Sequence, residues 1–457
     1  MNSVFQNSQE NISVEPMKLS PVNGKKVSAD FDGGQISSDA GALLLKETER
    51  QVGIINSIMA ALNDQRDQRY VKHKLLEMLQ QRTYQIACGY EDANDSDTLR
   101  NDPVFKMCAG KMPKSDAALS SQPTISRFEN TPSRTELYRI AEAFADNFID
   151  SYNEEPKVIV LDFDDTDDPV HGHQQLALFN GYFGDYCFMP LHIYEGLSGK
   201  LISAILKPGK RLKGKTILSI LKRVVAKLRK HWKNTLIVFR GDSHFTAPEI
   251  MEWIDKQENM SFVTGLTGNP VLKKMAETTI QSAENIYEKR QSKVKLFHTF
   301  HYQAASWAKP HRVIVKVEVD SKNSEPNLRF VVTGLGEAKT RALYEQIYCA
   351  RGNAELYIKD HKTYLKSDRT SCHRFEANQF RLFLHSAAYV LIHAMQNSVF
   401  KGTEFANATM QTIQLKILKI GARIKEMKTK IKVEMPTAFP QQGTVRKAFD
   451  IFEILRC

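Results

Sequence analysis

The sequence predicts an α/β fold that follows a helical N-terminal region, and three observations support this prediction. Four consecutive apolar residues, mostly β-branched, at Val158–Leu161 are typical of a buried strand in a largely parallel sheet. A second such run, Leu236–Phe239, ends in a Gly turn. Residues 38–150 instead show helical periodicity. At 457 residues and 42% hydrophobic content, the chain is long enough for more than one domain.

The N-terminal part divides into two predicted regions. Residues 1–20 are polar, which predicts a mobile terminus, and residues 21–153 are predicted to be mainly helical. The expected helices are Asp39–Gln51, Ile54–Leu62, Tyr70–Ala87 and Ser133–Asn153. Between them, Pro123 suits the first turn of another helix, whose hydroxyl residues could cap it or bind phosphate. A helix that only packs against its neighbours fits this segment equally well.

The α/β core is predicted to begin in residues 154–266 and to resume in residues 339–397, the second part containing a helix with Glu355. After the first strand, two strands are expected to form a hairpin, Tyr186–Glu195 and Lys200–Leu206. A basic helix up to Lys233 and the second apolar strand, which ends at Phe239, should follow. A helix at Pro248–Gln257 and a strand at Met260–Leu266 complete this part. The segment that follows is too long for one connection, because Asp242 and Glu355 are 113 positions apart. Residues 267–338 are therefore predicted to be a β-rich insertion, with alternating segments at Phe297–Tyr302, Arg312–Glu318 and Leu328–Val332. The basic C-terminal region, residues 398–457, is expected to contain strands at Gln414–Ile420 and Met427–Val433.

Carboxylates follow both apolar runs. Asp162 and Asp164 are two positions apart and so share one face of the first strand, and Asp242 follows the second. Each alone could be a loop or helix-capping residue. Converging carboxylates repel one another unless cations neutralise them, and hard oxygen ligands suit a pair of Mg²⁺ or Mn²⁺ ions. Two such ions favour in-line displacement at phosphorus. The six Cys have no CxxC or Cys-His ligand spacing that would compete.

A helix predicted over residues 341–365 provides a third acid. Tyr348, Arg351, Glu355 and Lys362 are spaced by 3, 4 and 7 residues, so all four lie along one stripe. Taken alone, such a stripe is typical of a surface helix with ion pairs.

These motifs together resemble the DDE transposases of bacterial insertion sequences, in the group whose third acid lies in a Tyr-x2-Arg-x3-Glu-x6-Lys signature. The resemblance spans roughly residues 20–440 and also rests on Leu161–Gln175, Arg240–Phe245 and His373–Leu382. It implies an RNase H-like catalytic core interrupted by the β-rich insertion, with two Mg²⁺ ions that Mn²⁺ can replace. It further implies cleavage at transposon ends and strand transfer into target DNA. The implied partners are double-stranded DNA with terminal inverted repeats, target DNA and a second copy of the chain in the DNA complex.

The resemblance assigns the metal ligands residue by residue. Its Asp-x-Thr form falls on Asp164 and Thr166, so Asp164, Asp242 and Glu355 are the expected catalytic acids. Asp162 remains the alternative first acid. Phosphate near the cut is expected to contact the other members of the signature, Tyr348, Arg351 and Lys362.

Two other functions fit parts of the sequence. The segment Val158–Thr166 also fits the nucleophile strand of haloacid-dehalogenase-like phosphatases, where Asp162 would form an aspartyl phosphate. That fold needs a second acid soon after Asp242, and none follows. The other alternative is a transposase-derived DNA-binding protein without catalysis, against which the intact acids argue.

The charge distribution favours a polyanionic partner. The chain carries a formal net charge of +11, and Lys200–Lys233 holds twelve Lys and Arg residues and no acid. A solvated helix face is one interpretation of this segment, and a track for the phosphate backbone that includes Lys210, Arg211 and Lys213 is the other. Transposon-end recognition is placed in the helical region. Its expected contacts are Gln122, Thr124 and Arg127.

Trp307 in the insertion is a candidate for stacking on a flipped base, although a buried aromatic would fit its position as well. The sequence has no run of 18 apolar residues and no signal-peptide pattern at its N-terminus. Together with scattered Cys residues, this predicts a cytoplasmic protein.

Overall fold

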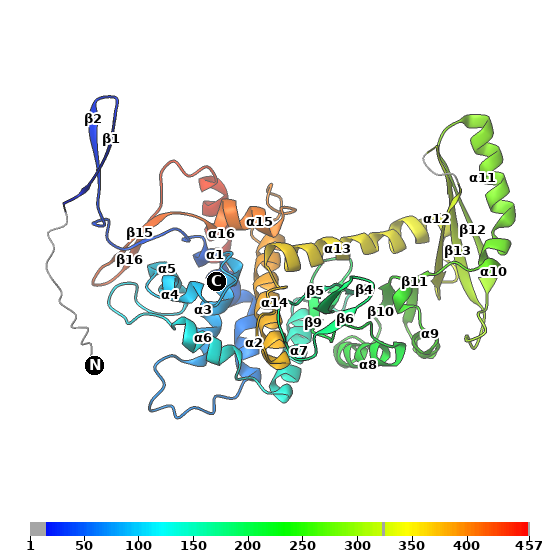
Figure 1. The fold of residues 1–457 in the computed structure, drawn as a ribbon, viewed down its shortest axis with the longest axis horizontal. Helices are drawn as coiled ribbons and strands as arrows, with labels where there is room; N and C mark the ends of the chain where they lie inside the picture. The colour runs from blue at the N-terminus through cyan, green and yellow to red at the C-terminus, as the bar shows by residue number, and fades with distance from the viewer. Residues whose placement is uncertain (1–14, 322–324, 456–457) are drawn as a thin grey trace, which may run out of the picture.

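A computed structural model describes residues 15–321 and 325–455, so most of the predicted mobile terminus lies outside the described residues. Figure 1 shows an elongated molecule with the helical N-terminal region at one end, the α/β core in the middle and the insertion at the other end. The long helical segment that carries α13 runs across the core towards the insertion.

The core is organised around one eight-stranded sheet with the order β12-β13-β14-β11-β10-β4-β8-β9. These strands are β4 (Val158–Asp165), β8 (Leu191–Glu195), β9 (Leu201–Ile205), β10 (Leu236–Gly241), β11 (Met260–Leu266), β12 (Val294–Tyr302), β13 (His311–Val319) and β14 (Asn327–Thr333). β8 pairs antiparallel with β4 and β9 pairs antiparallel with β8, whereas β10 pairs parallel with β4 and β11 parallel with β10. The order β9-β8-β4-β10-β11 is that of an RNase H-like sheet, which confirms the predicted α/β class.

The two faces of the sheet differ in what covers them. Ile159, Leu161 and Phe163 on β4 pack in a core with α8 (Gly214–His231) and α9 (Pro248–Ile254). Because side chains alternate along a strand, Val160, Asp162 and Asp164 face the opposite side. Apolar residues on that side pack against the start of a long helical segment. This segment contains α12 (Thr340–Ala342), η2 (Leu343–Tyr348), η3 (Cys349–Arg351), α13 (Gly352–Lys359) and η4 (Asp360–Tyr364).

The N-terminal region contains the expected helices and one hairpin that was not expected. Its helices are α1 (Ala42–Val52), α2 (Ile54–Ala61), α3 (Leu75–Ala87), α4 (Asp95–Leu99), α5 (Pro103–Cys108), α6 (Gln122–Glu129) and α7 (Arg134–Asp150). The hairpin consists of β1 (Met17–Val22) and β2 (Lys25–Ala29) and projects from the molecule (Figure 1). The long helix α14 (Phe375–Asn397) packs against α3, α1 and β9 and so joins this region to the core.

The C-terminal region returns to the N-terminal one. β15 (Ala422–Glu426) pairs with β16 (Ile431–Glu434) and with β3 (Ile36–Ser37), and α16 (Gln442–Ile454) follows. The expected strand at Gln414–Ile420 is wrong, because α15 (Met410–Ile413) continues into the π-helical η5 (Gln414–Leu418). Ile413 and Ile417 are four positions apart and both buried, so burial follows a helical period rather than alternation.

The insertion is not a separate sheet. Its three strands extend the core sheet, since β14 pairs antiparallel with β11 and with β13. It also contains two helices that were not predicted, α10 (Pro270–Met275) and α11 (Glu277–Arg290). In α11, Ala283 is buried, and Ile280, Ile286 and Tyr287 pack half-buried against the core at helical spacing.

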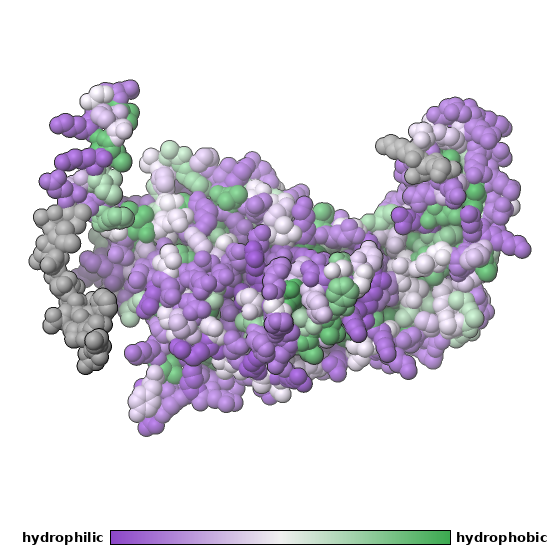
Figure 2. Space-filling view, viewed as in Figure 1, coloured by the Kyte–Doolittle hydropathy of each residue, from purple (hydrophilic) through white to green (hydrophobic). Residues whose placement is uncertain are grey.

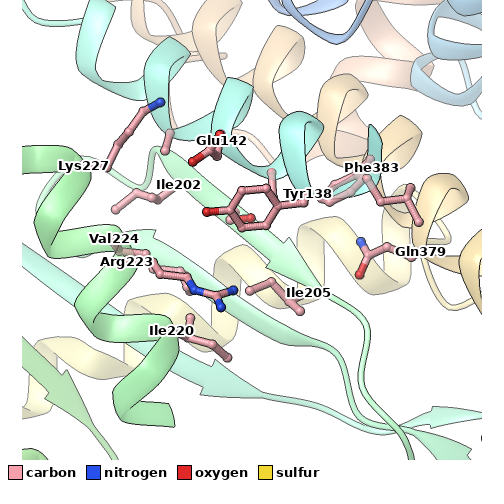
Figure 3. A pocket seen from close by; sticks show the side chains of 15 residues that line it. Tyr138, Glu142, Ile202, Ile205, Ile220, Arg223, Val224, Lys227, Gln379 and Phe383 are labelled. Carbon is pink, nitrogen blue, oxygen red and sulfur yellow. The ribbon is translucent and has the colours of Figure 1, made fainter. Parts of the chain in front are cut away.

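An apolar cavity of about 270 Å³ lies between α7, α8, β9 and α14 (Figure 3). Ile193 and Ile205 line it, and both belong to the sheet face that Phe163 occupies, so the cavity is on the side opposite Asp164. Tyr138 and Arg223 meet across it, with the guanidinium 5.5 Å from the ring centroid. No helix among the described residues has the length and apolar character needed to cross a bilayer.

Candidate active site

The structure places Asp164 at the end of β4, beneath the helical segment that carries Glu355. Asp164 is 9% exposed. Its carboxylate Oδ2 accepts a hydrogen bond from Arg351 Nη1 at 3.1 Å, and Arg351 Nη2 donates to Glu355 Oε1 at 2.8 Å. One guanidinium therefore joins the first and third predicted acids, which are far apart in the sequence.

Asp242 directly follows β10, the strand beside β4. Its side chain caps the short 3₁₀ helix η1 (Ser243–Phe245) and accepts from the His244 backbone N–H at 2.8 Å. Burial raises the pKa of Asp164 to about 7, the negative charges of Asp242, Asp165 and Glu355 add to the rise, and Arg351 opposes it. The pKa of Asp164 thus reports that all three predicted acids share one electrostatic environment.

This carboxylate set fits a divalent cation, since hard oxygen donors and clustered negative charge are what Mg²⁺ and Mn²⁺ bind. In the part of the chain that the structure describes, no three Asp, Glu, His or Cys side chains already form a group that could hold an ion. The Arg351 guanidinium contacts both Asp164 and Glu355 and provides the positive charge between them. An ion would replace that charge.

Asp162 has a different environment from Asp164. Its two oxygens accept from Arg240 Nε and Nη2, the latter at 2.6 Å, and both side chains are 1% exposed. Arg240 also donates from Nη1 to the carbonyl of Ile347 at 2.6 Å. Burial raises the pKa of Asp162 to about 6, and the hydrogen bonds from Arg240 oppose the rise. Asp162 therefore connects β4 and β10 to the start of the Glu355 helix.

The remaining signature residues lie beside the acids. Lys362 Nζ is 2.9 Å from Asp167 Oδ1, just beyond the end of β4. Burial raises the pKa of Tyr348, Arg351 lowers it, and the charge of Asp242 adds to the rise, which places the phenol near both. A Cβ added at Gly265 would lie 2.7 Å from the Tyr348 hydroxyl, so glycine leaves room for this ring.

The predicted DNA contacts lie in two separate places. Lys210, Arg211 and Lys213 are exposed in the loop between β9 and α8. In the same loop, Lys207 is buried and pairs with Asp165 at 3.1 Å, which ties the loop to the acid-bearing strand.

The other group, Gln122, Thr124 and Arg127, lies on α6 in the helical region, where Arg127 is exposed and the other two are half-buried. The backbone N–H of Gln122 donates to Asp97 Oδ1 at 3.0 Å, so this helix start already has an anionic partner.

Trp307 is buried, at 7% exposure. Tyr302 and His311 contact it edge to face, with ring centroids 5.4 and 5.5 Å away. Its ring packs in the core rather than facing a ligand, so the alternative of a buried aromatic accounts for its position and the stacking role does not.

Sequence reasoning did not single out Arg240 and Lys207. A signal existed for Arg240, because it interrupts the otherwise apolar run of a central strand. An arginine in such a position needs a buried carboxylate partner. Asp162, directly opposite it in the β4–β10 register, is that partner.

The sheet has the RNase H-like strand order, with Asp164 and Asp242 at the ends of the neighbouring strands β4 and β10 and Glu355 on the facing helical segment. The chain belongs to the transposase DDE domain group 1 family, whose model matches residues 19–457. It is therefore a DNA transposase of the DDE type, and the predicted resemblance to DDE transposases is confirmed.

Two further comparisons were made. A search of curated proteins finds no match. Among solved structures, the chain is similar to a piggyBac transposase synaptic complex with hairpin DNA, with a TM-score of 0.44 and 10% sequence identity, over 84% of this chain and 80% of that one. No residue or activity is transferred at this level of similarity.

Proposed function

We propose that this transposase cleaves the strands at transposon ends and joins the freed 3′ ends to target DNA, with Asp164, Asp242 and Glu355 as ligands of two Mg²⁺ ions. Mn²⁺ would substitute. The observation that carries the proposal is the Arg351 bridge between Asp164 and Glu355, together with the effect of the Asp242 charge on Asp164. Asp162 is not a ligand in this proposal, because Arg240 occupies both of its oxygens.

When bound, the ions supply positive charge for the attacking and leaving oxygens at phosphorus. The chain's own residues would position the DNA. Arg351 offers a planar set of donors that suits two phosphate oxygens, and Lys362 and Tyr348 add a point charge and a hydroxyl beside it. A phosphate held here would lie next to the three acids.

The remaining assignments follow from this placement. The helical region, residues 21–153, would recognise the terminal inverted repeats through Gln122, Thr124 and Arg127, and the loop with Lys210, Arg211 and Lys213 would track the backbone of double-stranded DNA. Residues 154–266 and 339–397 would form the catalytic core, with residues 267–338 as the insertion and residues 398–457 as a basic C-terminal region. The complex would be a homodimer, since two ends must be held together. We place the protein in the cytoplasm of a bacterium, acting on an insertion sequence.

A cleavage assay on a duplex carrying the element's terminal repeat tests this proposal. We expect cleavage with Mg²⁺ or Mn²⁺ and none with EDTA. Glu355→Gln should lower the rate by at least about 10³-fold, because the metal supplies several kcal/mol of charge stabilisation.

Glu345→Gln is the matched control, since Glu345 lies on the same helical segment and forms only a surface ion pair with Arg341. Its rate should equal that of the parent. If Glu355→Gln cleaves DNA as well as the parent does, the proposed ligand set is wrong. The alternative of a DNA-binding protein without catalysis would show metal-independent binding and no cleavage by either protein.

A further inference from the structure

Four aromatic side chains are exposed on one small hairpin beside the active site. The hairpin consists of β6 (Leu178–Asn180) and β7 (Asp185–Phe188). The exposed rings are Phe179 (53%), Tyr182 (78%), Phe183 (40%) and Tyr186 (57%). Figure 2 shows apolar surface in the middle of the molecule, over the region where Figure 1 draws β5 and β6. A group of exposed aromatic rings is unusual for a protein surface and marks a contact site.

The hairpin is held close to the catalytic acids. β7 pairs with β6 and with β5 (Asp168–Pro169), which follows three residues after the end of β4. Lys362 of the signature contacts Asp167, the residue that precedes β5. The rings therefore stand on a small sheet connected to Asp164 by a few residues and pinned by a residue of the active site.

The same hairpin is fixed to the basic loop. Asn180 Nδ2 donates to the carbonyl of Gly209 at 2.9 Å, and Phe188 forms a β-bridge with Pro208. Gly209 lies so close that an added Cβ would be 2.2 Å from the Cys187 carbonyl oxygen. The Arg211 guanidinium lies 5.4 Å from the centroid of the Tyr182 ring. Rings and cations thus form one surface.

We propose that this surface, residues 178–188 with Lys210 and Arg211, binds unpaired DNA bases next to the cleaved bond. Exposed aromatic rings beside a basic track are the chemistry that binds single strands, because each ring stacks on a base face while the cations contact phosphates. Base faces are hidden in a duplex, so the ligand is a separated strand or a splayed end. The inference rests on the proposed function for the presence of DNA at the neighbouring acids.

The local charges favour nucleic acid over a protein partner. Of the nearby acids, Asp165 is paired with Lys207 and Asp167 with Lys362. Asp185, the first residue of β7, is exposed, and its single negative charge is outnumbered by Lys210 and Arg211. Lys210 and Arg211 are exposed beside the rings. The surface therefore presents positive charge next to its apolar rings.

Binding of the full-length protein to two fluorescent oligonucleotides without metal tests the inference: a single-stranded oligo(dT) and a duplex of equal length. Tyr182→Ala/Phe183→Ala should weaken single-strand binding by at least about tenfold, because stacking is lost at two rings. Duplex binding should change by less than about twofold. Tyr182→Phe keeps a ring and should bind the single strand as the parent does.

Three outcomes would overturn the inference: both affinities unchanged, both lowered equally, or single-strand binding unchanged with loss of a dimer in light scattering. The last outcome would identify the rings as a protein interface. If the double variant does not fold, Tyr182→Ala replaces it, since this ring is 78% exposed. Cleavage by Glu355→Gln is measured separately, so a failure of the proposed function is distinguishable from a failure of single-strand binding.

Discussion

Two acids on one strand, Asp162 and Asp164, each meet an arginine, but the two regions differ in what surrounds the pair. Asp162 and Arg240 are both 1% exposed at their side chains, and every oxygen of the acid has a donor. The side chains of Asp164 and Arg351 are 13% and 20% exposed, and Arg351 is shared with Glu355, which is 61% exposed. The Asp162–Arg240 pair is therefore called the closed pair, and the Asp164–Arg351 pair, which is partly exposed to solvent, the open pair.

The difference separates a structural ion pair from a site. The closed pair also binds the Ile347 carbonyl, so it fixes the helix against the sheet. In the open pair one guanidinium contacts both Asp164 and Glu355, and burial together with the charges of Asp242 and Glu355 raises the pKa of Asp164 in spite of Arg351. Identical residue types two positions apart thus have different roles because one arginine is enclosed and the other can exchange its partners.

The largest expected effect concerns stability. Asp162→Asn leaves Arg240 buried without its counter-charge, which should lower the free energy of unfolding by about 3–5 kcal/mol. Asp164→Asn removes a buried carboxylate that is already costly to ionise, so at pH 8 the free energy of unfolding should be unchanged or higher. Urea denaturation of the two variants and the parent measures both.

The double variant Asp162→Asn/Arg240→Met is the control for this comparison. It removes the unpaired charge and should recover part of the loss. Equal destabilisation by Asp162→Asn and Asp164→Asn would show that the two pairs do not differ as described.

The elements around Asp164 were predictable because their patterns are local. The apolar runs of β4 and β10 and the β8–β9 hairpin are visible as strands, and the acids stand directly after them. Local sequence does not decide whether Asp162 or Asp164 is the first acid. The choice depends on Arg240 and on the Ile347 carbonyl, 107 positions further along the chain, which no pattern in the first strand indicates.

Two other features show where sequence patterns fail or were overlooked. Helix α11 had a weak signal that was overlooked, because Ile280, Ala283 and Tyr287 are spaced at helical intervals among polar residues. The β1–β2 hairpin also had a signal, because Asn23-Gly24 adopts positive φ values of 46° and 77°, as a tight hairpin turn requires. Trp307 is a candidate from the sequence as an aromatic residue of the insertion, whereas exposure distinguishes it from the rings of the 178–188 hairpin.

The next largest expected effect concerns the competition between protons and metal ions for the Asp164 carboxylate of the open pair. Burial raises the pKa of Asp164 from 3.8 to about 7, so between these values the folded protein keeps a proton that the unfolded chain loses. Without metal, the contribution of Asp164 to stability therefore falls as the pH rises from about 4 to about 7, and Asp164→Asn should flatten this slope. Mg²⁺ needs the ionised carboxylate, so its binding should weaken as the pH falls below about 7.

Thermal unfolding with and without Mg²⁺ at pH 8 and pH 5.5 measures this. At a free ion concentration 100-fold above the dissociation constant, stabilisation at pH 8 should be about 2.7 kcal/mol, and it should be much smaller at pH 5.5. Asp162→Asn should keep the difference between the two pH values. A stabilisation by Mg²⁺ that survives in Asp164→Asn at full size would exclude Asp164 as a ligand.

The smallest expected effect concerns the loop from β9 to α8, where one lysine is buried in an ion pair and another is exposed. Lys207 is buried against Asp165, whereas Lys210 is exposed three residues later. Lys210→Gln should leave thermal stability unchanged and reduce the slope of log affinity against log salt for duplex DNA by about one, as expected for one lost phosphate contact. Lys207→Met should instead lower stability, because it leaves the Asp165 carboxylate without its partner. A salt slope that falls with Lys207→Met but not with Lys210→Gln would place the DNA backbone elsewhere, and the exposed loop would then be a solvated surface.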